Sequence, residues 1–239
     1  MTGKEEWRLW RDGSRSPYDN MAIDELLLQQ ATTIGTPVVR IYDWDRPAVS
    51  IGYVQKYDAA PQQDYTIVRR PPGGGVVFHD VDLTYTVVVP AGHAICRLDR
   101  MESYHVFHRA ILRLLDHFGH HGQLAQNECG PVDRATMQCF TTPTRYDVLC
   151  GQTKYAGAAQ RRTRDGILHQ GSIAVTAADG DKTALAANLA DGLAAELGIV
   201  WQEFTPSDSF MATAVRLGKD KYARPEWNIT RTWKPVPER

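Results

Sequence analysis

The sequence has no excess of charge of either sign and no long apolar run. Its 239 residues hold 27 Lys and Arg against 28 Asp and Glu, and this balance argues against a general electrostatic affinity for nucleic acid or an anionic membrane. No stretch approaches the roughly 20 apolar residues of a membrane-spanning helix, and MTGKEEWRLWRDG at the start lacks the apolar core of a signal peptide. We therefore expect a cytoplasmic protein that uses neither nucleic acid nor a membrane as a partner.

Cysteine is also scarce, and the spacing of the four cysteines excludes a C-x-x-C motif. The four residues, Cys96, Cys129, Cys139 and Cys150, contain no C-x-x-C pair. Free thiols are the expectation in a chain without a secretion signal. A lone intracellular cysteine is most often an inert buried residue, so residue type by itself selects no nucleophile.

The remaining composition is that of an ordinary globular protein, with 43% hydrophobic and 23% charged residues. No repeat, low-complexity tract or long linker divides the chain. We therefore expect a single domain over residues 1–239 without a C-terminal accessory domain. The polar segment 119–145 is the one long loop expected, and long loops in compact domains tend to be functional or mobile.

Hydrophobic periodicity predicts several helices and two groups of strands. Helices are expected at 16–31, 101–118 and 181–197, with a last one starting near Asp208. Strands are expected at 38–44, 48–53, 65–70, 76–80, 83–89, 146–149, 154–162 and 169–175. Because the helices bracket the strand groups instead of alternating with them, the pattern favours an α+β fold with a mixed sheet flanked by helices.

The stretch RRPPGGGVVFH (69–79) places three consecutive glycines between two apolar runs. Gly73, Gly74 and Gly75 permit positive φ angles and a close approach of a ligand to the backbone, and successive N–H groups in such turns can bind an anion. The spacing matches neither a phosphate-binding P-loop nor a dinucleotide fingerprint. From these residues alone, a plain strand connection and the wall of a site both remain open.

For other polar residues, too, spacing alone does not decide between a structural and a functional role. Lys154, between Gly151 and Gly157, is either a solvated strand residue or a fixed cation that polarises a carbonyl or holds a phosphate. The three histidines of HFGHHG (117–122) favour a solvated helix end over a metal site, since no further ligands lie nearby in the sequence. Three arginines, Arg161, Arg162 and Arg164, fit either a solvated basic strand or contact with an acidic carrier protein.

Taken together, six stretches in order resemble one family, the lipoate-protein ligases and octanoyltransferases that share a biotin/lipoate ligase catalytic domain. They are SPYDNMAIDE (16–25), RIYDW with SIGYVQ (40–55), RRPPGGGVVFHDVDLTYTVVVP (69–90), CFTTPTRYDVLCGQTKYAGAAQRR (139–162), LHQGSI (168–173) and KYARPEWN (221–228). The resemblance implies a mixed sheet flanked by helices, related to biotin ligases and class II aminoacyl-tRNA synthetases.

The resemblance also implies an acyl pocket with two opposite walls. Arg70, Gly73, Gly74, Gly75 and His79 would form one wall. Lys154 and Gly157 would form the other, with the Lys154 ammonium beside the acyl carbonyl, where it stabilises the oxyanion of acyl transfer.

LHQGSI would add His169, Gly171 and Ser172 to the substrate-binding residues. Two positions depart from the family pattern. Pro72 stands where Thr or Ser is common, and His169-Gln170 reverses a common Gln-His order, which leaves open which of the two side chains faces the pocket.

The run from Cys139 to Val148 resembles the octanoyltransferase branch of the family, whose nucleophile is this cysteine. The implied reaction moves octanoyl from octanoyl-acyl carrier protein to Cys139, and then to a lysine on a lipoyl domain of glycine cleavage H protein or a 2-oxoacid dehydrogenase E2 subunit. Lys154 would favour the thiolate. This reaction needs no cofactor and no metal, and no residue is assigned as general base; Cys150 is the rival thiol.

Three alternative functions remain open beside octanoyl transfer. An ATP-dependent lipoate-protein ligase would form lipoyl-AMP with ATP and Mg²⁺ and would need no covalent nucleophile. An amidotransferase would move octanoyl or lipoyl groups between protein lysines through a cysteine. A non-catalytic acyl-binding protein would keep the pocket and lack turnover.

Overall fold

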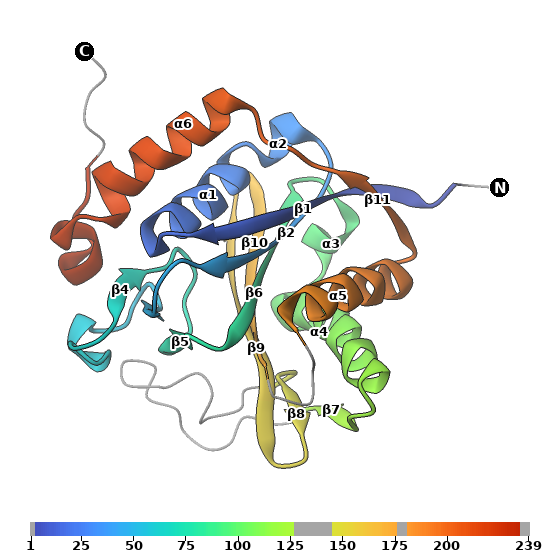
Figure 1. Cartoon of the computed structure of the whole chain (residues 1–239). Coiled ribbons are helices and arrows are strands. Elements are labelled where there is room, and N and C mark those ends of the chain that lie inside the picture. Colours follow the sequence, from blue (N-terminus) through green and yellow to red (C-terminus); the bar gives the residue numbers. More distant parts are fainter. Residues whose placement is uncertain (1–2, 127–144, 176–180, 235–239) are drawn as a thin grey trace.

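The computed structural model describes residues 3–126, 145–175 and 181–234, and shows two β-sheets with helices packed around them (Figure 1). The larger sheet has the strand order β11-β1-β2-β6-β10-β9-β8-β7, and the smaller one the order β4-β3-β5. Strands of the larger sheet are β1 (Glu5–Arg15), β2 (Val38–Trp44), β6 (Asp82–Pro90), β7 (Gly122–Leu124), β8 (Val148–Cys150), β9 (Thr153–Thr163), β10 (Gly166–Ala174) and β11 (Ile199–Glu203). Strands of the smaller sheet are β3 (Ala48–Ile51), β4 (Thr66–Arg69) and β5 (Val77–His79).

The helices are those that the sequence predicts, with a few short additions. They are α1 (Pro17–Gln29), α2 (Ala31–Ile34), α3 (Ala94–Arg97), α4 (Arg100–His117), α5 (Lys182–Leu197) and α6 (Asp208–Leu217), with short turns η1 (Tyr57–Ala59), η3 (Gly218–Tyr222) and η4 (Glu226–Thr230). Ser16 starts α1 by accepting a hydrogen bond from the Asp19 amide, and Asp99 with Glu102 forms a capping box at α4. No helix in the described part of the chain combines the length and apolar character needed to cross a membrane.

Strand directions make the larger sheet mixed, as expected. β1 runs parallel to both β2 and β11, whereas β6 pairs antiparallel with β2 and β10, and β9 antiparallel with β10 and β8. In the smaller sheet, β3 is parallel to β4 and antiparallel to β5. The predicted α+β class with a mixed sheet flanked by helices is therefore confirmed.

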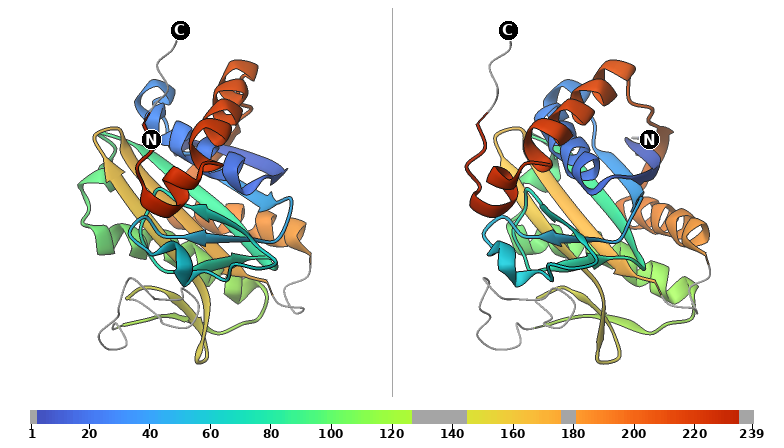
Figure 2. Two further views of the ribbon diagram at one scale, coloured as in Figure 1. Left: turned by 90° about the vertical axis from the view of Figure 1, so that its left-hand side faces the viewer. Right: turned by 60° about the vertical axis from the view of Figure 1, so that its left-hand side comes forward.

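Helices cover both faces of the larger sheet (Figure 2). On one face, α4 and α5 pack against alternate strand residues such as Val39, Tyr85 and Val87 to form the main core. On the other face, α1 and α6 pack against the intervening residues, among them Val38 and Val88. This alternation follows from strand geometry, since successive side chains point to opposite faces.

A third core cluster joins the two sheets to the C-terminal turns. Met21 of α1, Tyr42 of β2, Val68 of β4 and Trp227 of η4 pack together in it. The smaller sheet thereby lies on the α1 side of the larger one, next to the residues after α6 (Figure 2).

Three strands were not predicted. β1 and β11 have mixed, partly exposed sequences, and each is held by parallel pairing with residues far away in the chain. β7 lies inside the segment predicted to be a loop, so that prediction is wrong for Gly122–Leu124, which pairs with β8. Local propensity could not reveal them because strand formation depends on cross-strand partners.

Candidate functional site

A pocket lies between the two sheets, and its floor is a row of paired residues in the larger one. Gly157 of β9 pairs with Ser172 of β10, Ser172 with Thr84 of β6, and Thr84 with Tyr42 of β2. All four residues line the pocket, which encloses about 440 Å³ of empty space, its open mouth included. Since paired residues point to one face of a sheet, this row forms a groove floored by three small residues, with Tyr42 on the last of the four paired strands.

The roof of the pocket comes from the smaller sheet and from α1. Ser50 of β3, Val77 and His79 of β5, and Arg70 directly after β4 line it, together with Met21 of α1. The pocket therefore combines an apolar lining with a small number of buried polar groups, as small-molecule sites generally do.

The glycine run shapes the pocket through Arg70. The Arg70 guanidinium donates hydrogen bonds to the carbonyl oxygens of Gly73 (2.8 Å) and Gly75 (2.6 Å), and to the carbonyl and hydroxyl oxygens of Ser50. Gly74 has a φ of 87°, a conformation that favours glycine. The pocket lining includes Arg70 but none of the three glycines. The carbonyl groups of Gly73 and Gly75 hold the Arg70 side chain that lines it.

Lys154 enters the pocket as half of a buried ion pair. Its Nζ lies 2.7 Å from Oδ2 of Asp147, and both side chains are 2% exposed. A buried ammonium without an anion is costly, so the carboxylate is what allows a charged lysine at this depth. Gly157 leaves the space for it, because a Cβ there would lie 2.5 Å from Lys154 Cε.

His79 belongs to a hydrogen-bonded chain across the pocket wall. Its two ring nitrogens lie 2.8 Å from Ser50 Oγ and 2.8 Å from Asp82 Oδ2, and its ring stacks on Trp44 at 4.0 Å between centroids. Ser172 also donates to the Asp82 carboxylate. Burial alone would raise the pKa of Asp82, but the charge and hydrogen bond of His79 and the neighbouring hydroxyl groups hold it below its ordinary value.

The structure places Gln170, and not His169, in the pocket. His169 points to the α4 side of the sheet, where its ring lies 4.7 Å from that of Phe107 and its Nδ1 lies 3.0 Å from Gln160 Nε2. Burial, and then the charge of His108, hold the pKa of His169 well below its ordinary value. The expectation that His169 lines the substrate pocket is therefore not met, because strand alternation gives that position to its neighbour.

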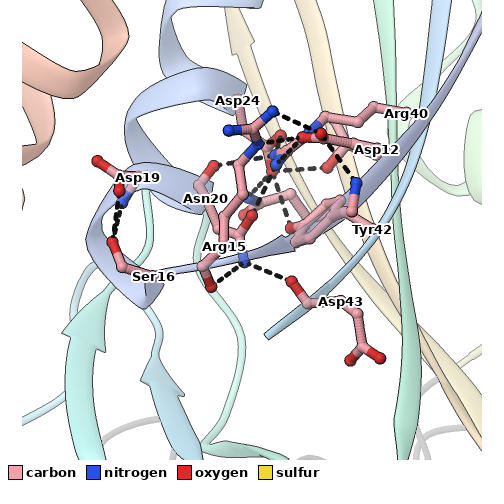
Figure 3. A network of polar contacts seen from close by, with 12 residues as sticks. Asp12, Arg15, Ser16, Asp19, Asn20, Asp24, Arg40, Tyr42 and Asp43 are labelled. Carbon is pink, nitrogen blue, oxygen red and sulfur yellow. Dashed lines mark hydrogen bonds and ion pairs between the residues drawn. The ribbon is translucent and has the colours of Figure 1, made fainter. Parts of the chain in front are cut away.

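Gln170 is hydrogen-bonded to a network of buried polar residues, whose members Asp24, Arg40 and Tyr42 are labelled in Figure 3. Its Nε2 donates to Asp24 Oδ2 at 2.6 Å, and Asp24 also accepts from Arg40 (2.8 Å) and from the Tyr42 hydroxyl (3.0 Å). Arg40 continues the network to Asp12. Because Tyr42 and Gln170 both line the pocket, this network fixes that part of its lining.

The structure thus brings together six of the predicted site residues and leaves others aside. Those in the pocket lining are Arg70, His79, Lys154, Gly157, Gly171 and Ser172. Cys139, predicted as the nucleophile, lies outside the described residues. The rival thiol Cys150 is half-buried on β8, while burial raises the pKa of Cys96 on α3.

Several lining residues were not predicted from the sequence. They are Met21, Tyr42, Trp44, Ser50, Val77, Thr84, Ala158, Ala159 and Gln170, and Asp147 was missed as the partner of Lys154. All of them lie within the stretches that carry the family resemblance, so their position in those stretches was the available signal. Within residues 3–126, 145–175 and 181–234, no three His, Cys, Asp or Glu side chains gather as they would to hold a metal ion.

A family model matches most of the chain. Residues 16–192 match the model of the lipoyl protein ligase A/B catalytic domain. The chain belongs to this family. The matched range includes every residue of the pocket lining, so the pocket is part of the family's catalytic domain.

Curated relatives of this family member carry the name Octanoyltransferase LipM. The protein of Moorella thermoacetica is 34% identical over 180 residues, covering 72% of this chain and 66% of that protein. That of Staphylococcus aureus is 34% identical over 182 residues, covering 71% and 66%. The match thus spans slightly less than two thirds of these relatives. The protein of Halalkalibacterium halodurans is 29% identical over 274 residues, covering 94% of this chain and 99% of that protein.

Solved structures support the same fold. A lipoate-protein ligase A bound with ATP superposes with a TM-score of 0.77 at 20% identity, covering 95% of this chain and 99% of that one. A bi-partite lipoate protein ligase from Thermoplasma acidophilum gives a TM-score of 0.76 at 20% identity, covering 98% and 100%. At this identity the likeness concerns the fold alone.

Proposed function

We propose that this protein is an acyltransferase that moves an octanoyl group from octanoyl-acyl carrier protein to a lysine of a lipoyl domain. One observation carries the proposal: a groove floored by small side chains runs to the buried Lys154–Asp147 pair. In the proposal, an acyl chain lies along this groove with its carbonyl oxygen at the Lys154 ammonium. Relatives with the name Octanoyltransferase LipM support this substrate class.

In the proposed first step, the Cys139 thiolate attacks the carbonyl carbon of the donor thioester. The ammonium of Lys154 stabilises the oxyanion of the tetrahedral intermediate. The intermediate collapses by breaking the carbon–sulfur bond to the carrier, whose thiolate leaves and takes up a proton, and octanoyl remains on Cys139 as a thioester.

In the second step, the neutral ε-amine of the acceptor lysine attacks this thioester. The Cys139 thiolate leaves, the new amide loses its extra proton to solvent or a base, and the enzyme returns to its starting state. Both steps balance without ATP, so the proposal requires no cofactor. The proposed acceptor is a lipoyl domain of glycine cleavage H protein or of a 2-oxoacid dehydrogenase E2 subunit. The description of the bi-partite lipoate protein ligase together with its E2 lipoyl domain supports this class of acceptor.

Intact-mass measurement tests this function directly. The protein is incubated with octanoyl-acyl carrier protein without ATP, and we expect an added octanoyl mass that is absent in Cys139→Ala and present in the matched control Cys150→Ala. Subsequent addition of a lipoyl domain should discharge the adduct. Absence of an adduct in the unmodified protein, with lipoyl-domain modification that requires ATP and free lipoate, would overturn the proposal in favour of a ligase.

A further inference from the structure

The C-terminal turn η4 binds the outer edge of the smaller sheet through two side chains. Both main-chain polar groups of Arg69, the last residue of β4, bond to this turn and not to another strand. The Arg69 amide donates to Asn228 Oδ1 at 2.7 Å, and the Arg69 carbonyl accepts from Trp227 Nε1 at 2.9 Å. β4 is an edge strand, so a segment about 160 positions further along the chain completes its hydrogen bonding.

The side chain of Arg69 extends this contact into the loop after β3. Its guanidinium is fully buried and donates to the carbonyl oxygens of Gly52 (2.9 Å), Tyr53 (3.0 Å) and Gln55 (2.7 Å), and to that of Asn228 (2.6 Å). Burial lowers the pKa of Arg69 to about 10. In the described part of the chain the hydrogen-bond partners of the Arg69 guanidinium are all carbonyl groups, so this side chain acts as a cross-link between loop 52–55 and η4.

Loop 52–55 in turn supports the glycine run. The Tyr53 amide donates to the carbonyl of Pro72 at 2.8 Å. Gly52 packs so closely on the run that a Cβ there would lie 2.1 Å from the Gly74 carbonyl oxygen. The carbonyls of this run hold the Arg70 side chain in the pocket lining.

We propose that Asn228 is a positioning residue for the pocket, which it reaches through Arg69, loop 52–55 and the glycine run. Its amide is well suited to this role, because Nδ2 donates to the carbonyls of Tyr222 (2.6 Å) and Arg224 (3.1 Å) and thereby directs Oδ1 at the Arg69 amide. Only the identity of the ligand, an acyl group, rests on the proposed function.

Three variants separate positioning from general stability. Asn228→Ala removes all the hydrogen bonds of the amide side chain. Trp227→Phe keeps an aromatic ring and the Asn228 side chain, and it removes the N–H that reaches Arg69 together with part of the buried indole. Tyr222→Phe is the control, because it lies in the neighbouring turn and removes a hydrogen bond to Glu25 (2.7 Å) without touching Arg69.

Two measurements are made on the full chain. In hydrogen–deuterium exchange, we expect Asn228→Ala and Trp227→Phe to speed the exchange of amides in residues 73–77 and 52–55 by about tenfold, with Tyr222→Phe near the unmodified protein. In steady-state octanoyl transfer, the two variants should raise KM for the octanoyl carrier by about tenfold, whereas loss of folded protein would lower kcat and leave KM unchanged.

Unchanged exchange in residues 73–77 for both variants, or equal effects of Tyr222→Phe, would overturn the positioning role. If the unmodified protein shows no octanoyl transfer, the proposed function fails, while the exchange experiment still decides the role of Asn228.

Discussion

At the scale of single residues, the space in and around the pocket depends on glycines, which have no Cβ atom. A Cβ added at Gly157 would meet the end of the Lys154 side chain, at 2.5 Å from Cε and 2.7 Å from Nζ. A Cβ at Gly171 would lie 2.2 Å from the buried ring of Tyr85, and one at Gly73 would meet nothing within 4 Å. The same substitution therefore has three different consequences, which the sequence alone does not distinguish.

We expect Gly157→Ala to lower activity by more than its loss of stability explains. The added methyl group displaces the end of Lys154 within its buried ion pair with Asp147, so the free energy of unfolding should fall by about 1–3 kcal/mol. Displacement of Nζ should lower kcat/KM for octanoyl transfer by about tenfold or more, because acyl transfer is sensitive to small misplacements. Urea denaturation and steady-state kinetics measure the two quantities.

Two matched glycines provide controls for this prediction. Gly73→Ala should leave the free energy of unfolding and kcat/KM near those of the unmodified protein, because its Cβ meets nothing within 4 Å. Gly171→Ala should lower the free energy of unfolding, because the Tyr85 ring that its Cβ meets is fixed in the core. Unchanged kinetics in Gly157→Ala would contradict the assigned place of Lys154 in the pocket.

At the scale of elements, periodicity predicted the main helices and most of the strands that carry the site. The predicted helix at 101–118 is found as α4, and the predicted strand at 38–44 is found as β2. The predicted strand 48–53 ends earlier, at Ile51, because Gly52 begins the loop that packs on the glycine run. Sequence pattern could not show this packing, since the partner residues lie more than 20 positions away.

Packing between these two loops predicts a large effect of Gly52→Ala. The added Cβ would lie 2.1 Å from the Gly74 carbonyl oxygen and 2.8 Å from the Gly73 carbonyl carbon, and neither main-chain atom can rotate away. We expect a loss of about 1–3 kcal/mol in the free energy of unfolding and weaker octanoyl transfer. Gly13→Ala, with nothing within 4 Å of its Cβ, is the control in urea denaturation; equal stability of the two variants would refute the packing argument.

At the scale of the whole molecule, the larger sheet separates the face that lines the pocket from the face that carries the main core. The α1 side holds the pocket and Lys154, and the α4 side holds the main core. His108 and His169 are fully buried on the α4 side, with ring centroids 5.7 Å apart. Burial lowers the pKa of His108, although the charge of Asp147 opposes this shift. Burial also holds the pKa of His169 well below its ordinary value.

This buried pair predicts a loss of stability in mild acid. In the unfolded chain both imidazoles bind protons as the pH falls through about 6.5, whereas in the folded chain they stay neutral to lower pH. The unfolded state then binds more protons, so the free energy of unfolding should fall as the pH is lowered from about 7 to 5.

Urea denaturation across this range measures the slope of stability against pH. His169→Asn should have a shallower slope than the unmodified protein, because one of the two titrating groups is gone. His117→Asn, which changes an exposed residue at the end of α4, is the control and should keep the slope. A slope in His169→Asn as steep as that of the unmodified protein would show that the buried pair is not its source.

By itself, the sequence determined the fold class, the family, most elements and the stretches that contain the pocket, because these depend on local periodicity and on ordered motifs. Only the tertiary structure decided which side chains of those stretches meet. Strand register chose Gln170 over His169, since neighbouring residues of a strand face opposite sides of the sheet. Long-range packing joined Lys154 to Asp147 and Asn228 to Arg69, and such contacts follow from the arrangement of strands and turns in space, which no local pattern records.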